Sequence, residues 1–186
     1  MSAARDDNVF VFGVSGHRDL VPADLPELRE QLRDIFRRFM STRPQATFEL
    51  LTPLAEGADR VAAHEALSAG IKLVVPLPMA QAEYERDFTT TESLDEFRQL
   101  LGAAVSHFEL STPAGVNRAQ KYAAAGDYIA QQSDVLILLW DGEDNRKVGG
   151  TAWVKKQREH WSGLAKGKEL ETIHVRTRRQ ASLAGS

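Results

Sequence analysis

Small, hydroxyl-bearing and basic residues gather directly after the first apolar segment of the chain. Glycine allows tight turns and leaves backbone N–H groups open to phosphate oxygens, and the polar side chains here add hydrogen-bond donors. The spacing fits neither the Gly-x-Gly-x-x-Gly dinucleotide pattern nor a Walker loop. A plain strand-to-helix turn is the alternative interpretation. We expect five residues of this run to bind a phosphate-bearing ligand: Gly13, Ser15, Gly16, His17 and Arg18.

A second group follows the next apolar segment, where Glu56, Gly57, Ala58 and Asp59 precede an expected helix. Backbone amides at a helix start carry partial positive charge and favour an anion. Alternatively, Gly57 only turns the chain and Asp59 is a favourable acid in the first helical turn. We include all four residues in the predicted ligand site.

A third group follows the most apolar segment of the chain. Asp141 could accept hydrogen bonds from ribose hydroxyls, and the glycine pair before Thr151 could hold phosphate at a helix start. Trp140 offers a flat face for a base, although a core tryptophan is the alternative. The predicted binding residues here are Trp140, Asp141, Gly142, Gly149, Gly150 and Thr151.

Other candidate residues are weaker. Tyr84, Glu85 and Asp87 lie in a segment bounded by prolines and could form a lid, but a solvent-exposed helix face is the favoured interpretation. The five histidines show no metal-ligand spacing and cysteine is absent, so no metal site is predicted.

Strand and helix patterns alternate along almost the whole chain. Apolar and β-branched runs predict strands at 9–12, 48–54, 72–75, 105–110, 135–140 and 172–175. Apolar residues at spacings of three and four predict helices at 25–39, 58–69, 81–88, 93–104, 117–132 and 151–161. Capping boxes are expected from Asp24 with Glu27 and from Ser93 with Glu96.

Several of the expected strands are continuously apolar, which is typical of a parallel sheet covered on both faces. Together with the alternation, this predicts an α/β fold with a doubly wound, mainly parallel sheet and helices on both faces. Ligands of such sheets bind beyond the carboxyl ends of the strands. We expect one nucleotide-binding domain over 1–176 and a loose polar tail over 177–186.

Composition narrows the functional classes. The chain has 186 residues, of which 42% are hydrophobic and 26% charged, as in an ordinary folded domain. From the formal net charge of −3 we expect a nucleic-acid partner to be unlikely. The chain shows no secretory leader and no apolar run long enough to cross a bilayer, so we expect a cytoplasmic protein without a membrane partner.

The motifs resemble those of the SLOG superfamily, which groups Smf/DprA proteins with LOG enzymes. The resemblance rests on four pieces, and it spans roughly residues 9–175. It implies a Rossmann-like fold, a nucleotide-like ligand, a bacterial source and frequent dimers, so a homodimer is expected. The four pieces are Gly13-Val14-Ser15-Gly16-His17-Arg18, Glu56-Gly57-Ala58-Asp59-Arg60, Ser133-Asp134 leading into Trp140-Asp141-Gly142, and Gly149-Gly150-Thr151.

One position departs from the LOG pattern Pro-Gly-Gly-x-Gly-Thr-x-x-Glu, because Val154 stands where that glutamate would be. The leading hypothesis is therefore binding or sensing of a nucleotide-derived ligand, such as an ADP-ribose-type or cyclic nucleotide signal, with no further cofactor. The alternative is an enzyme that cleaves or transfers an N-glycosidic bond, with Glu56 or Asp141 as the catalytic candidates and Asp59 as a third carboxylate on the predicted site loops. A single-stranded DNA binder is disfavoured by the acidic balance.

Overall fold

The computed structural model describes residues 8–144, 148–164 and 170–180, which form one sheet with helices around it. The sheet has six parallel strands in the order β4-β3-β2-β1-β5-β6. The strands are β1 (Val9–Gly16), β2 (Thr47–Leu51), β3 (Lys72–Leu77), β4 (Ser106–Glu109), β5 (Val135–Trp140) and β6 (Glu171–Arg176). The helices are α1 (Leu25–Ser41), α2 (Ala58–Ser68), α3 (Gln81–Tyr84), α4 (Thr91–Ala103), α5 (Arg118–Gln132) and α6 (Thr151–Leu164), and the 3₁₀ turns are η1 (Pro22–Asp24) and η2 (Glu85–Asp87).

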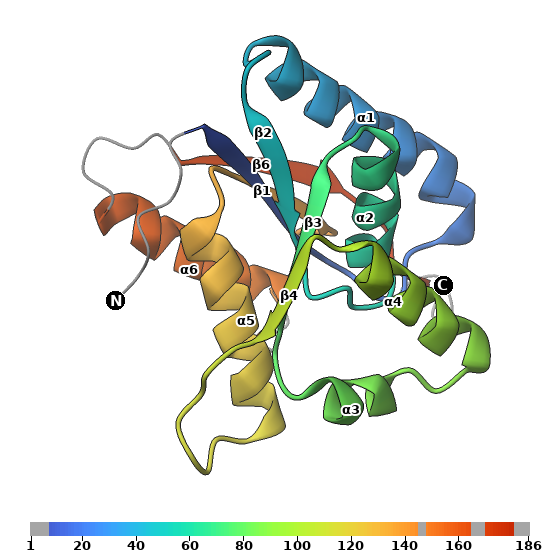
Figure 1. The fold of residues 1–186 in the computed structure, drawn as a ribbon, viewed down its shortest axis with the longest axis vertical. Coiled ribbons are helices and arrows are strands. Elements are labelled where there is room, and N and C mark those ends of the chain that lie inside the picture. Colours follow the sequence, from blue (N-terminus) through green and yellow to red (C-terminus); the bar gives the residue numbers. More distant parts are fainter. Residues whose placement is uncertain (1–7, 145–147, 165–169, 181–186) are drawn as a thin grey trace.

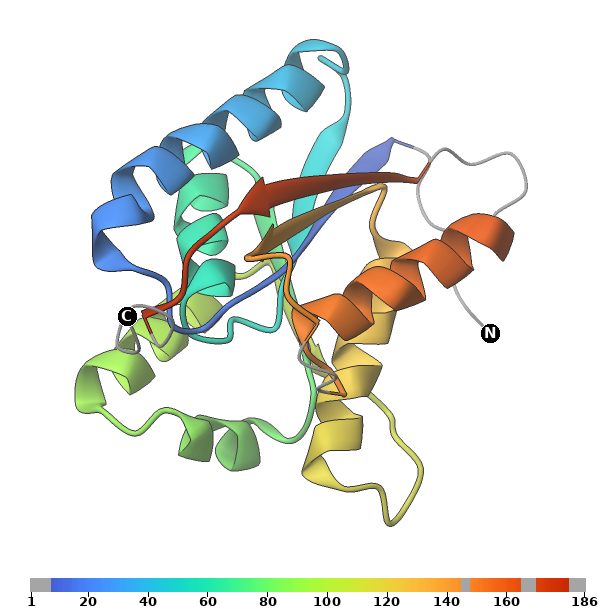
Figure 2. The same cartoon turned by 180° about the vertical axis from the view of Figure 1, so that it is seen from behind.

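The helices lie on both faces of the sheet. Helices α1 and α2, with α4 beside α2, cover one face, and α5 and α6 pack together on the other (Figure 1). The view from behind shows the same two layers, with β6 crossing in front of the central strands (Figure 2). This arrangement confirms the expected doubly wound α/β architecture.

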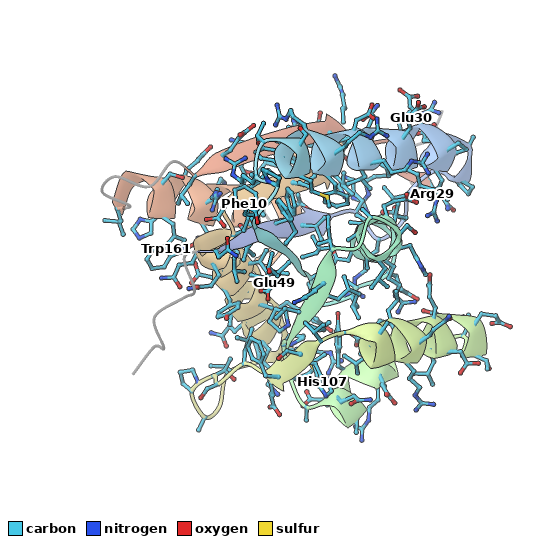
Figure 3. The ribbon with its side chains drawn as sticks, turned by 45° about the horizontal axis from the view of Figure 1, so that its top comes forward. Phe10, Arg29, Glu30, Glu49, His107 and Trp161 are labelled. Atoms are coloured by element: carbon cyan, nitrogen blue, oxygen red, sulfur yellow. The ribbon has the colours of Figure 1, made fainter. Side chains whose placement is uncertain are left out.

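Burial of apolar side chains explains why the apolar segments of the sequence form the strands and helices of this fold. All six residues of β5 are buried, as its unbroken apolar run predicts for a central parallel strand. On the α1 face, Phe12 packs edge-on against Phe36 with ring centroids 5.0 Å apart. Figure 3 shows Phe10 on this side of the sheet and Trp161 on α6 across from it. The two faces thus hold separate apolar clusters joined through the sheet.

Two expected helix caps are wrong. The Asp24 side chain does not cap α1 and instead binds Arg178, with Arg178 Nε donating to Asp24 Oδ2 at 2.9 Å. Helix α4 is capped by Thr90, whose hydroxyl accepts from the Ser93 amide at 3.1 Å. For Asp24 the cause is tertiary, because its carboxylate binds an arginine more than 150 residues away in sequence.

The chain after β6 continues to pack against the body, whereas a loose tail was expected from residue 177. Thr177 is buried, and Arg179 forms an antiparallel bridge with Leu20. Arg179 Nε also donates to Asp19 Oδ1 at 3.0 Å, and the Gln180 amide donates to the Asp19 carbonyl at 2.8 Å. The described part of the tail, through residue 180, therefore helps to hold the loop that follows β1; the residues beyond 180 lie outside the described structure.

A buried arginine joins elements at the amino-terminal edge of the sheet. Arg158 on α6 is 1% exposed, and its guanidinium donates to four backbone carbonyls at 2.7–2.9 Å. The carbonyls belong to Ala130 and Ser133 at the end of α5, to Asp134 before β5 and to Glu171 in β6. Burial lowers the pKa of Arg158 to about 10, so the group stays charged at neutral pH.

We expect Arg158→Met to lower the free energy of unfolding by about 3 kcal/mol or more, because several buried carbonyls would lose their donor. Urea unfolding followed by circular dichroism measures this. The control Arg37→Met removes an exposed arginine of α1 and should change stability by less than about 0.5 kcal/mol. Equal midpoints for the two variants would contradict the structural role.

Candidate ligand-binding site

The candidate site lies where the strand order reverses direction. Successive β-α units run outward from β1 to β2, β3 and β4, and the chain then returns to place β5 on the other side of β1. The gap between the connections that leave β1 and β5 is therefore the topological switch point, where open parallel sheets bind ligands. A pocket of about 560 Å³ opens at this point.

The pocket is lined from the segments that follow β1, β2, β3, β5 and β6 and from α5. Nine predicted site residues line it, and six do not. The nine are Ser15, Gly16, His17, Arg18, Asp59, Trp140, Gly149, Gly150 and Thr151. The six outside the lining are Gly13, Glu56, Gly57, Ala58, Asp141 and Gly142.

The first glycine group is not a loop, as was expected, but the second half of β1. Residues 13–16 pair in register with Leu136 to Leu139 of β5. A Cβ at Gly13 would lie 2.7 Å from Ile129 Cγ2, and one at Gly16 would lie 2.4 Å from Ala58 Cβ. These glycines let helices α5 and α2 approach the sheet, and the loop itself starts at His17.

His17 connects the loops that follow β1 and β5. Its Nε2 lies 3.1 Å from the Asp141 backbone nitrogen and 3.1 Å from Asp141 Oδ1. The same carboxylate accepts from the Glu143 amide at 2.9 Å. Burial raises the pKa of Asp141, but the hydrogen bonds from Glu143 and His17 outweigh it and hold the pKa below its usual value. Asp141 thus closes its own loop beside the pocket.

The second glycine group packs against the loop after β1. Gly57 has a φ of 77°, and a Cβ there would lie 2.4 Å from the Arg18 carbonyl oxygen. The Ala58 amide donates to the His17 carbonyl at 3.0 Å. Glu56 turns away toward α4, where its carboxylate accepts from the Ser93 hydroxyl.

Asp59 is the acid of this group that lines the pocket. It is 5% exposed and accepts from the Ala55 amide at 3.2 Å. Burial raises the pKa of Asp59 to about 7, against the opposing effects of the Ala55 amide, Arg18, the Thr52 hydroxyl and Arg60. A carboxyl that titrates near neutrality inside a pocket is a feature of functional sites.

The third predicted group contributes Trp140 to one wall of the pocket and residues 149–151 at the start of α6. The Trp140 indole N–H donates to the Glu143 carbonyl at 3.1 Å, and its ring lies 5.4 Å from the His174 ring. Gly149 has a φ of 78° and lies against Tyr122 on α5. The amides at the start of the 14-residue helix α6 therefore lie at the pocket, where they favour an anion.

Residues from the middle of the chain complete the pocket, and sequence reasoning missed most of them. Asp87 accepts from the Tyr122 hydroxyl and from Arg118, and Arg18 Nη2 lies 3.9 Å from its carboxylate. Tyr84 is fully buried, so the exposed-face interpretation of its segment is wrong there. The four-residue spacing of Tyr84 and Phe88 was the sequence signal that indicated a buried face, and their rings pack together with centroids 5.2 Å apart. The polar lining residues that were not among the predicted binding residues are Asp19, Tyr84, Asp87, Arg118, Tyr122 and Arg179.

Comparison with known proteins gives structural likeness only. No protein-family model matches the sequence, and no curated protein is similar to it. DNA processing protein A (DprA) from Streptococcus pneumoniae superposes with a TM-score of 0.58 at 12% identity, over 83% of this chain and 48% of that one. DprA from Helicobacter pylori superposes with a TM-score of 0.56 at 14% identity, over 92% of this chain and 67% of that one. At this level of identity the likeness is one of fold alone.

The likeness corrects one sequence-based expectation. The Helicobacter structure is described as showing a single-stranded DNA binding mode, so a neighbour in this fold has a nucleic-acid partner. The expectation that a nucleic acid is an unlikely partner therefore does not stand. Net charge averages over the whole chain and does not report how charges are distributed: the pocket is lined by Arg18, Arg118 and Arg179 together with Asp19, Asp59 and Asp87. Within the described ranges, no helix is long and apolar enough to cross a bilayer.

Because Gly16 packs against α2 and β5, a substitution at this glycine tests packing rather than ligand contact. We expect Gly16→Ala to lower the melting temperature, because its Cβ would lie 2.5 Å from the Leu139 carbonyl oxygen, which the sheet holds in place. Gly102→Ala on α4 meets no atom within 4 Å and should raise stability by about 0.5–1 kcal/mol. Calorimetric melting of both variants measures the difference, and a stable Gly16→Ala protein would refute the packing role.

Proposed function

We propose that the protein binds a nucleotide or nucleotide-derived ligand in the pocket between the β1 and β5 loops. The observation that carries the proposal is the position of the pocket, directly over the switch point of a parallel sheet. Its volume of about 560 Å³ is in the range of small-molecule sites, about 300–1,000 Å³.

The charges around the pocket support a phosphate-bearing ligand. Arg18, Arg118 and Arg179 line it from three different parts of the chain, and each is between a third and a half exposed. Arginine matches phosphate oxygens in pairs of hydrogen bonds. Residues 149–151 add the α6 helix start on the same pocket. We place the phosphate group among these arginines and this helix start.

The positions of the two acids that the sequence suggested as catalytic, Glu56 and Asp141, favour a binding or sensing role over catalysis. Val154 is 2% exposed and packs against Gly126 on α5, so an apolar contact occupies the position of the LOG glutamate. Glu56 binds Ser93, and Asp141 binds within its own loop. Neither acid lines the pocket.

One observation favours an enzyme on the N-glycosidic bond as a second candidate. Asp59 lines the pocket with a pKa raised by burial to about 7, which suits a general acid or base. Asp59 replaces Glu56 and Asp141 as the candidate catalytic group in that hypothesis.

Single-stranded DNA is a further candidate ligand. Its support is the likeness to DprA over most of this chain, together with the arginines around the pocket. A strand that threads its backbone past these arginines would use the same phosphate contacts as a small nucleotide. A direct binding comparison separates the two ligands.

We expect AMP, ADP-ribose or cyclic AMP at a hundred times its dissociation constant to raise the melting temperature by about 5 °C or more. Thermal shift measurements with these ligands and with a fifteen-nucleotide oligothymidylate test this. A shift with the oligonucleotide alone would favour the DNA candidate. No shift with any ligand would contradict the proposal.

We expect no release of adenine from AMP or dAMP and no release of nicotinamide from NAD at an enzyme-like rate. Loss of one acid–base or electrostatic group typically costs about a hundredfold to ten-thousandfold in rate. Chromatography of the free base after incubation with purified protein is the measurement. Multiple turnovers that disappear in Asp59→Asn would establish the enzyme instead.

A further inference from the structure

Two buried polar side chains, Asp59 and Tyr84, line the pocket, and the Tyr84 hydroxyl has no hydrogen-bond partner in the described part of the chain. Asp59 comes from the first turn of α2 and Tyr84 from α3, and both line the pocket. Their exposed fractions are 5% and 0%. Burial raises the pKa of Tyr84, and the charge of Asp59 adds to this effect, so the two groups lie within electrostatic range of each other.

The Tyr84 hydroxyl has no hydrogen-bond partner among the described residues. Its ring packs against Phe88 at 5.2 Å and Phe97 at 5.6 Å, contacts that a phenylalanine would make equally well. A buried hydroxyl without a partner is destabilising, because it loses its hydrogen bonds to water. The core therefore explains the ring but not the hydroxyl.

Asp59 also lacks a neutralising partner of its own. Its contacts in the described structure are hydrogen bonds from the Ala55 amide and the Thr52 hydroxyl, with no ion pair within 4 Å. Its neighbour Arg60 points to α4, where Nη1 donates to the Ser93 carbonyl and to Glu96 at 2.8 and 2.9 Å. A carboxylate buried in this way gains from an added hydrogen-bond donor.

We infer that Asp59 and Tyr84 form a recognition subsite for an uncharged donor–acceptor group of the ligand. The N–H or O–H of that group donates to the Asp59 carboxylate, and its lone pair accepts from the Tyr84 hydroxyl. The inference rests on the proposed function and concerns an uncharged part of the nucleotide.

The charges decide against a charged group at this subsite. A phosphate would be repelled by the Asp59 carboxylate, and a cation would lie near Arg18 and Arg60, both close enough to affect Asp59. A sugar hydroxyl and the amino-and-ring-nitrogen edge of adenine both offer one donor beside one acceptor. Sites that hydrogen-bond such a group discriminate strongly against analogues that lack it.

Isothermal calorimetry with the full chain and ADP-ribose at pH 8 tests the subsite. We expect Asp59→Asn and Tyr84→Phe each to weaken binding at least tenfold. The melting temperature of each variant without ligand should stay equal to or above that of the wild type, because the changes remove a buried charge and a buried unpaired hydroxyl.

Two matched controls separate recognition from packing. Glu65→Gln changes a buried carboxylate of α2 that binds Arg29 and Arg33 outside the pocket, and Tyr128→Phe changes a half-buried tyrosine of α5. Both should keep the affinity of the wild type. Unchanged affinity in either Asp59→Asn or Tyr84→Phe would overturn the subsite while leaving the proposed function intact. A wild-type protein that binds no ADP-ribose would overturn both.

A second set of titrations distinguishes the two sources of the group, with AMP, 2′,3′-dideoxy-AMP and IMP at pH 8. A tenfold loss confined to dideoxy-AMP assigns the sugar hydroxyls, and a tenfold loss confined to IMP assigns the adenine edge. Equal affinity for all three ligands would overturn the inference.

The pH dependence gives a readout that a packing role would not produce. The raised pKa of Asp59, about 7, means that acid protonates the acceptor, so affinity for ADP-ribose should fall as pH drops through 7, approaching tenfold per unit. The charged groups that act on Asp59 are Arg18 and Arg60, Asp87 acts on Tyr84, and His17 lies on the pocket wall. A fall with the same slope in Asp59→Asn would overturn the role of Asp59.

Discussion

The close approach of three backbone segments at Gly16 and Gly57 determines the geometry of the pocket. Gly16 ends β1 in contact with Ala58 and with the Leu139 carbonyl, and Gly57 lies against the carbonyls of His17 and Arg18. Any side chain at either position would separate β1, β5 and the start of α2. The pocket walls are therefore placed by contacts that only glycine permits.

This constraint makes the glycines structural elements of the site rather than ligand contacts. Residues 13–16 pair with β5, so most of the backbone expected to hold phosphate belongs to the sheet ladder. The helix start at residues 149–151 lies at the pocket, together with arginines whose partners are the lining acids Asp19 and Asp87. The glycine contacts thus close the strand ends on the side of α2, while the pocket opens beside the start of α6.

The two edges of the sheet hold different kinds of buried polar groups. At the amino-terminal edge, one guanidinium of Arg158 serves four backbone carbonyls, which joins α5, β5, β6 and α6. At the carboxyl edge, Asp59 and the Tyr84 hydroxyl are buried with few partners or none among the described residues. The first group joins backbone segments, while the Tyr84 hydroxyl at the second edge lacks a hydrogen bond that a ligand can supply.

The sequence alone determined the fold class, because its signals are local. The unbroken apolar run of β5 and the alternation of strands with helices predicted a covered parallel sheet with its site at the carboxyl edge, and the structure has that sheet. Only the tertiary structure decided the strand order, the extension of β1 through Gly16 and the side chains that face the pocket. Asp59 faces it, Glu56 does not, and Tyr84 and Arg118 reach it from distant segments. The physical reason is that periodicity reports which face of an element is apolar, whereas the direction of a polar side chain depends on partners such as Ser93 for Glu56, 37 residues away.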